Sequence, residues 1–151
     1  MSRYLIVAHQ TAASPTLVER VRAVSRNDPA AEFLLLVPAT PVRHLLSRRR
    51  REGEAETAAR ISAEEAKAVF TEAGINLIDT RVGNASPVDA IAAELKRHPG
   101  YAGLIISTLP PQQSRWLRDD VPGQAQHQFG LPVIHVEATP DQPDGLTGPM
   151  P

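Results

Sequence analysis

The side chains best suited to chemistry in this chain follow or end two apolar runs. His9, Gln10 and Thr11 come directly after the first run, and Ser107 and Thr108 end a later one. An imidazole, an amide and several hydroxyls can bind a small polar ligand, or they can cap backbone groups in local turns. The sequence leaves both interpretations open, and the first predicts a ligand pocket.

A different interpretation makes Ser107 a nucleophile and His9 its base, as in a small hydrolase. The chain lacks a G-x-S-x-G elbow, and no aspartate is placed to orient His9, so the pattern argues against this chemistry. Metal binding is not expected either. The five histidines form no H-x-x-x-H or H-E-x-x-H pair, and there is no cysteine.

Two arginine-containing stretches could bind an anion. The run Arg48 to Arg51, with Arg43 and His44 upstream, is followed by glutamates and has no aromatic residues among it for base stacking. We therefore expect it to be a solvated surface segment, with an anion-binding role as the less favoured interpretation.

The second stretch, residues 114–120, contains the only tryptophan. We expect Trp116 and Leu117 to pack on the sheet while the neighbouring arginines pair with Asp119 and Asp120. The alternative is that this stretch determines specificity for a ligand or a protein partner. Arg115 would then reach the ligand.

The elements that must position these residues alternate along the chain. Strands are predicted at Tyr4 to Ala8, Glu32 to Val37, Ile75 to Val82, Gly103 to Thr108 and Pro132 to Val136. Helices are predicted from Ser14-Pro15 to about Asn27, from Glu54 to Ala73, from Ser86-Pro87 to about His98 and from Val121 to Phe129. This β-α-β-α-β-α-β-α-β order predicts an α/β domain with a parallel sheet and helices on both faces.

Four segments together resemble the universal stress protein superfamily. They are Leu5 to Thr11, Arg81 to Ile91, Leu104 to Thr108 and Leu131 to Val136, and the resemblance covers roughly residues 4–137. It implies a five-stranded parallel sheet in the order 3-2-1-4-5. It also implies a dimer formed through the last strand.

In a sheet of that order, the crevice between strands one and four is the usual place for a ligand. The predicted small-ligand residues at this crevice are His9, Gln10, Thr11, Val37, Ser107, Thr108 and Arg115.

The chain also departs from the pattern that this resemblance implies. Nucleotide-binding members carry a glycine-rich run after the fourth strand, whereas Leu109 is followed here by Pro110 and Pro111, which have no N–H to donate. The pair Asp119 and Asp120 is expected nearby, where carboxylates would repel a polyphosphate. Nucleotide-binding members also carry an aspartate at the end of the first strand, and His9 stands at that position here. We therefore expect no cofactor, with ATP and AMP disfavoured.

Size and composition set the remaining expectations. A chain of 151 residues with a net charge of −1 fits one globular domain and gives no general attraction to nucleic acid or to an anionic membrane. The domain is assigned to residues 1–138, and the proline-rich residues 139–151 are expected to be a disordered tail. No signal or membrane-spanning segment is evident, so we expect a soluble, cytoplasmic protein.

These observations favour a universal stress protein-like module without enzymatic activity, acting as a small-ligand sensor or through a protein partner. One alternative is a module that binds ATP or AMP through a remodelled loop. The other is the hydrolase that uses Ser107 and His9. A homodimer is expected because the last strand, Pro132 to Val136, would otherwise leave an apolar sheet edge open.

Overall fold

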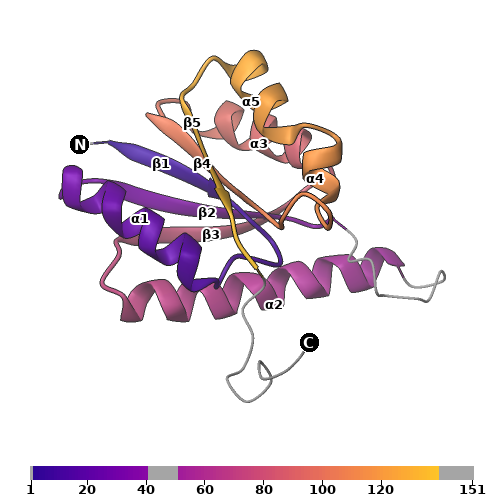
Figure 1. Cartoon of the computed structure of the whole chain (residues 1–151), viewed down its shortest axis with the longest axis horizontal. Helices are drawn as coiled ribbons and strands as arrows, with labels where there is room; N and C mark the ends of the chain where they lie inside the picture. The colour runs from indigo at the N-terminus through magenta and orange to yellow at the C-terminus, as the bar shows by residue number, and fades with distance from the viewer. Residues whose placement is uncertain (1, 41–50, 140–151) are drawn as a thin grey trace.

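The structure is a computed structural model that describes residues 2–40 and 51–139. Its centre is a parallel five-stranded sheet in the order β3-β2-β1-β4-β5 (Figure 1). The strands are β1 (Arg3–Val7), β2 (Glu32–Pro38), β3 (Leu77–Gly83), β4 (Gly103–Thr108) and β5 (Val133–Glu137). The helices are α1 (Pro15–Asn27), α2 (Arg51–Glu72), α3 (Pro87–Arg97), α4 (Arg115–Arg118) and α5 (Val121–Phe129). The predicted topology is confirmed.

Two helical layers bury the two faces of the sheet. Helices α1 and α2 cover one face, and α3, α4 and α5 cover the other (Figure 1). Successive residues of a strand point to opposite faces, so Ile6 belongs to the core cluster under α1 and α2 while Leu5 and Val7 belong to the other. This explains why the central strands read as continuous apolar runs without alternation.

Serine caps begin two of the helices as the sequence predicts. The Ser14 hydroxyl accepts from the amide of Thr16 at 3.1 Å and begins α1, and the Ser86 hydroxyl accepts from the amide of Asp89 at 3.3 Å and begins α3. In each case a proline occupies the first helical position, where its missing N–H costs nothing.

Several boundaries differ from the prediction. Helix α2 begins at Arg51 instead of Glu54, β3 begins at Leu77 instead of Ile75, and β5 is shifted by one residue toward the C-terminus. The arginine run lies outside the described residues apart from the backbone of Arg51, and so do Arg43 and His44 upstream. Of the expected tail, only Thr139 is described.

The register of the two central strands determines where the polar residues gather. Val7 of β1 lies opposite Ile106 of β4, so the residues that follow Val7 meet the end of β4 at the same edge of the sheet. At this point β2 continues the sheet on one side of β1 and β4 on the other. No helix in the described ranges is long and apolar enough to cross a membrane.

Candidate functional site

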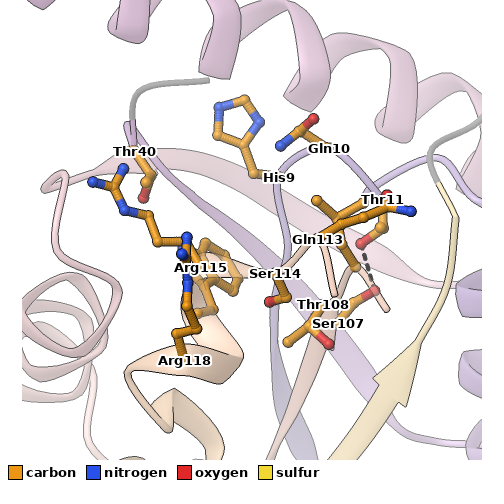
Figure 2. A pocket seen from close by; sticks show the side chains of 12 residues that line it. His9, Gln10, Thr11, Thr40, Ser107, Thr108, Gln113, Ser114, Arg115 and Arg118 are labelled. Atoms are coloured by element: carbon orange, nitrogen blue, oxygen red, sulfur yellow. Dashed lines mark hydrogen bonds between the residues drawn. The ribbon is translucent and has the colours of Figure 1, made fainter. Parts of the chain in front are cut away.

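A pocket lies at the carboxyl edge of the sheet, beside the ends of β1 and β4 (Figure 2). Its wall comes from the segments after β1 and β2, the end of β4, and the loop and short helix α4 that follow β4. The lining residues are His9, Gln10, Thr11, Thr40, Ser107, Thr108, Leu109, Gln113, Ser114, Arg115, Trp116 and Arg118. This is the crevice at which ligands bind in open α/β sheets.

The structure brings together six of the seven residues predicted for this crevice. Val37 is the exception, because its side chain is fully buried in the core cluster under α1 and α2. The six that line the pocket are His9, Gln10, Thr11, Ser107, Thr108 and Arg115.

Hydrogen bonds involve four of the hydroxyls in the wall. Thr11 Oγ1 and Ser107 Oγ lie 2.5 Å apart, and the dashed line in Figure 2 marks this pair. Thr108 Oγ1 lies 2.8 Å from Nε2 of His135 on β5. Ser114 Oγ accepts from the amide of Leu117 at 3.0 Å and caps α4. These groups hold the wall in place and are already partnered.

His9 is buried, with 7% of its surface exposed. Its Nδ1 lies 3.4 Å from Ser62 Oγ on α2, and its Nε2 has no hydrogen-bond partner within the described residues. Burial lowers the pKa of His9, an effect partly offset by a hydrogen bond to its own backbone, so the imidazole is neutral near pH 7. His9 forms no hydrogen bond to Ser107, whose partner is Thr11, so the nucleophile and base of the hydrolase interpretation are not assembled.

Two arginines supply the charge of the pocket. Arg115 and Arg118 are three residues apart on α4 and project from the same side of it (Figure 2). Neither forms an ion pair with any described residue, so the expected pairing with Asp119 and Asp120 is wrong. No acidic residue lines the pocket in the part of the chain that the structure describes.

The two aspartates expected beside a phosphate are directed elsewhere. Asp120 caps α5, where its Oδ1 accepts from the amide of Gly123 at 3.3 Å, and it adopts a left-handed backbone with φ of 53°. Asp119 lies in a separate surface depression beside Asp89 and Gln124. The expected repulsion between these carboxylates and a bound anion is therefore not a property of this pocket.

Four further polar residues in the wall were not in the predicted crevice set: Thr40, Gln113, Ser114 and Arg118. Once Ser114 is taken as a helix cap, Arg118 follows from its spacing to Arg115, and that signal was available in the sequence. Trp116 was expected only in the core. It is 8% exposed, packs in the cluster under α3 and α5, and also lines the pocket, while Leu117 is half-buried.

Metal chemistry finds no support in this geometry. Residues 2–40 and 51–139 contain no group of three histidine, aspartate or glutamate side chains close enough to hold an ion.

Comparison with known proteins identifies the fold of this α/β domain. No protein-family model matches the chain, and no curated protein matches its sequence. Solved structures do match. A universal stress protein in complex with cAMP superposes with a TM-score of 0.61 at 15% identity, over 91% of this chain and 98% of the other.

Two further structures agree. A universal stress protein from Archaeoglobus fulgidus gives a TM-score of 0.62 at 11% identity, over 90% of this chain and 93% of the other. A universal stress protein family protein from Arabidopsis thaliana with AMP bound gives 0.57 at 12% identity, over 92% and 93%. The chain therefore has the fold of the universal stress proteins.

Proposed function

We propose that this protein is a ligand-sensing module of the universal stress protein type, without enzymatic activity, whose pocket binds a small anionic ligand. The observation that carries this proposal is the pair Arg115 and Arg118, which line the pocket without ion pairs to any described residue. Two guanidinium groups on one wall, with no carboxylate among the lining residues, attract an anion.

Mononucleotides are the ligand class that we consider first. The pocket occupies the crevice where doubly wound sheets bind nucleotides, and two proteins of the same fold are described with cAMP and with AMP. The sequence argument against nucleotides had three parts, and one of them, the replacement of the first-strand aspartate by His9, still stands. The carboxylates of Asp119 and Asp120 no longer count, because they do not line the pocket. The prolines after β4 remain an argument against a phosphate cradle made of backbone N–H groups, and they limit how a nucleotide can bind.

Enzymatic activity is the weaker candidate. The Ser107 hydroxyl is hydrogen-bonded to Thr11 instead of His9, and no carboxylate stands in the pocket to orient the imidazole. A sensor needs only a ligand and a response, and a bound anion that links α4 to the ends of β1 and β4 would change how firmly α4 is held.

Trp116 gives a direct test, because it is the only tryptophan and it lines the pocket. Titration with AMP or cAMP should change its fluorescence saturably, with a dissociation constant at or below about 100 μM, the range of roughly 5–6 kcal/mol. Calorimetry under the same conditions gives an independent value. If neither method detects either ligand at 1 mM, the mononucleotide assignment is wrong.

Variants of the two arginines locate the site. Arg115→Ala and Arg118→Ala should each weaken AMP binding by about tenfold, the loss of one charge-assisted contact at a partly exposed position. Arg20→Ala is the matched control, since Arg20 is an exposed arginine on α1, outside the pocket. Equal loss in all three variants would mean that general charge, and not this pocket, holds the ligand.

A further inference from the structure

The loop that joins β4 to α4, residues 109–114, offers an anion few backbone donors. Pro110 and Pro111 carry no N–H, and the amide of Gln113 donates to the carbonyl of Pro110 at 2.9 Å. Three of the six backbone nitrogens in this loop are therefore unable to contact a ligand. A cradle for a chain of phosphates depends on several such amides pointing at the ligand.

The hydroxyls beside the loop are also occupied. Ser114 Oγ caps α4, Ser107 Oγ bonds to Thr11, and Thr108 Oγ1 bonds to His135. Ser114 Oγ accepts in its cap contact and keeps its own O–H to donate, but a neutral hydroxyl adds no positive charge to the pocket. Among the described residues that line the pocket, the positive charge thus comes from the guanidinium groups of Arg115 and Arg118, because His9 is neutral near pH 7.

Guanidinium groups recognise a single tetrahedral or planar anion. Each can form two parallel hydrogen bonds to the oxygens of one phosphate or carboxylate. Two of them within one helical turn suit one anionic group of charge near −2. After Arg118 the chain continues with Asp119 and the α5 cap Asp120. No further cation therefore follows the two arginines before α5 begins.

We infer that this pocket recognises a ligand with one phosphate group, held by Arg115 and Arg118, and that a β- or γ-phosphate adds no affinity. The inference rests on the proposed function, because it names the ligand class of the same site. It adds a requirement that the proposed function does not make: the affinity of the protein for the nucleotide must not rise from AMP to ADP to ATP.

The test compares these three nucleotides on the wild-type chain by calorimetry at one ionic strength, with and without Mg²⁺. The expected result is that ATP binds no more than about threefold tighter than AMP, less than 1 kcal/mol. ATP binding tenfold tighter than AMP would overturn the inference and leave the proposed function standing. Absence of binding by all three nucleotides would instead overturn both.

A variant that restores the missing donors gives the converse test. Pro110→Gly/Pro111→Gly adds two backbone N–H groups beside the pocket, and the ratio of ATP to AMP affinity should then rise by at least about threefold, the effect of one additional hydrogen bond. The ratio is the measured quantity because greater loop flexibility affects both nucleotides alike. A thermal melt checks that the variant is folded. An unchanged ratio in a folded variant would contradict the role assigned to the loop.

Inorganic phosphate and adenosine separate the two parts of the ligand. If one phosphate is the recognised group, phosphate alone should compete with AMP at millimolar concentration, and adenosine should bind at least tenfold more weakly than AMP. Adenosine binding as tightly as AMP would show that the arginines do not contact the phosphate, and the inference would fail.

Discussion

At the scale of single residues, His9 joins the pocket to α2 and is a buried titratable group. Its ring is enclosed, its Nδ1 lies 3.4 Å from Ser62 Oγ, and burial lowers its pKa. The folded chain therefore disfavours the charged imidazolium, whereas the unfolded chain accepts the proton at the ordinary histidine pKa of 6.5. Protonation must consequently favour unfolding.

We expect the stability of the protein to fall as the pH drops through 6.5 and on toward the lower pKa of folded His9. His9→Gln should remove this part of the pH dependence, and His127→Gln, at an exposed position on α5, should leave it intact. Thermal melts of the three proteins at pH 7.5 and pH 5.5 make the comparison. An equal loss of melting temperature in wild type and His9→Gln would mean that other groups cause the acid sensitivity.

The sequence predicted most of the pocket but not its charge. His9 and Ser107 could be placed because the carboxyl ends of parallel strands meet at one edge of the sheet. Val37 was placed wrongly because alternation along β2 turns its side chain into the core under α1 and α2. The spacing of Arg118 to Arg115 indicates that the two share one side of α4, but which way that side of a four-residue helix faces depends on how the helix packs.

At the scale of elements, one buried carboxylate ties α3 to its surroundings. Glu94 is 2% exposed, and its Oε2 accepts from the Tyr101 hydroxyl at 2.8 Å. Arg81 of β3 places Nε 3.1 Å from the other oxygen as an ion pair, although its N–H is not aligned for a hydrogen bond. Burial, followed by the hydrogen bond to Glu94, raises the pKa of Tyr101, so its hydroxyl stays protonated and donates.

Tyr101→Phe should therefore lower the free energy of unfolding by about 1–3 kcal/mol, because Glu94 Oε2 is left buried without a hydrogen bond. Tyr4→Phe is the matched control. Tyr4 stacks on Phe33 with 5.7 Å between ring centroids, and its hydroxyl makes no hydrogen bond to a described residue. Urea unfolding measures both variants. Equal effects would show that the Tyr101–Glu94 contact contributes nothing specific.

Most elements were predictable because local signals agree with burial. Serine caps followed by proline begin α1 and α3, and glycine with a φ of 67° at position 130 ends α5. The sequence did not predict residues 51–53 as part of α2, because they are polar or glycine and give no apolar periodicity. The close approach of Gly83 to Ala90, where a Cβ would lie 3.0 Å from Ala90 Cβ, is likewise set by packing alone.

At the scale of the whole molecule, the alternation of strands and helices predicted a parallel sheet with helices on both faces, and the resemblance to universal stress proteins implied the strand order. The structure and the fold comparison agree with both. What the alternation cannot specify is assembly, because an edge strand has the same local pattern whether or not another chain pairs with it. Within residues 2–40 and 51–139, strand β5 is such an edge and pairs only with β4. Its apolar residues Val133 and Ile134 are only half-buried in the single chain.

The free edge of β5 leads to the prediction of a homodimer. The amide of Leu104 donates to the Pro132 carbonyl and the amide of Ala138 donates to the Thr108 carbonyl, both at 2.9 Å, so the even-numbered positions of this strand face β4. Alternate residues of a parallel strand face opposite sides, and the N–H groups of Val133, His135 and Glu137 therefore point away from the sheet. Unpaired strand edges of this kind favour pairing with a second copy.

We expect light scattering to give twice the mass of one chain at micromolar concentration. Glu137→Pro removes one outward N–H from each copy without breaking a bond to β4, so it should raise the dimer dissociation constant by at least about tenfold, the loss of two symmetry-related hydrogen bonds near 1 kcal/mol each. Glu137→Ala removes the same carboxylate but keeps the N–H, and it should dimerise like wild type. A monomeric wild-type chain, or equal weakening by both variants, would place any self-association on a surface other than the β5 edge.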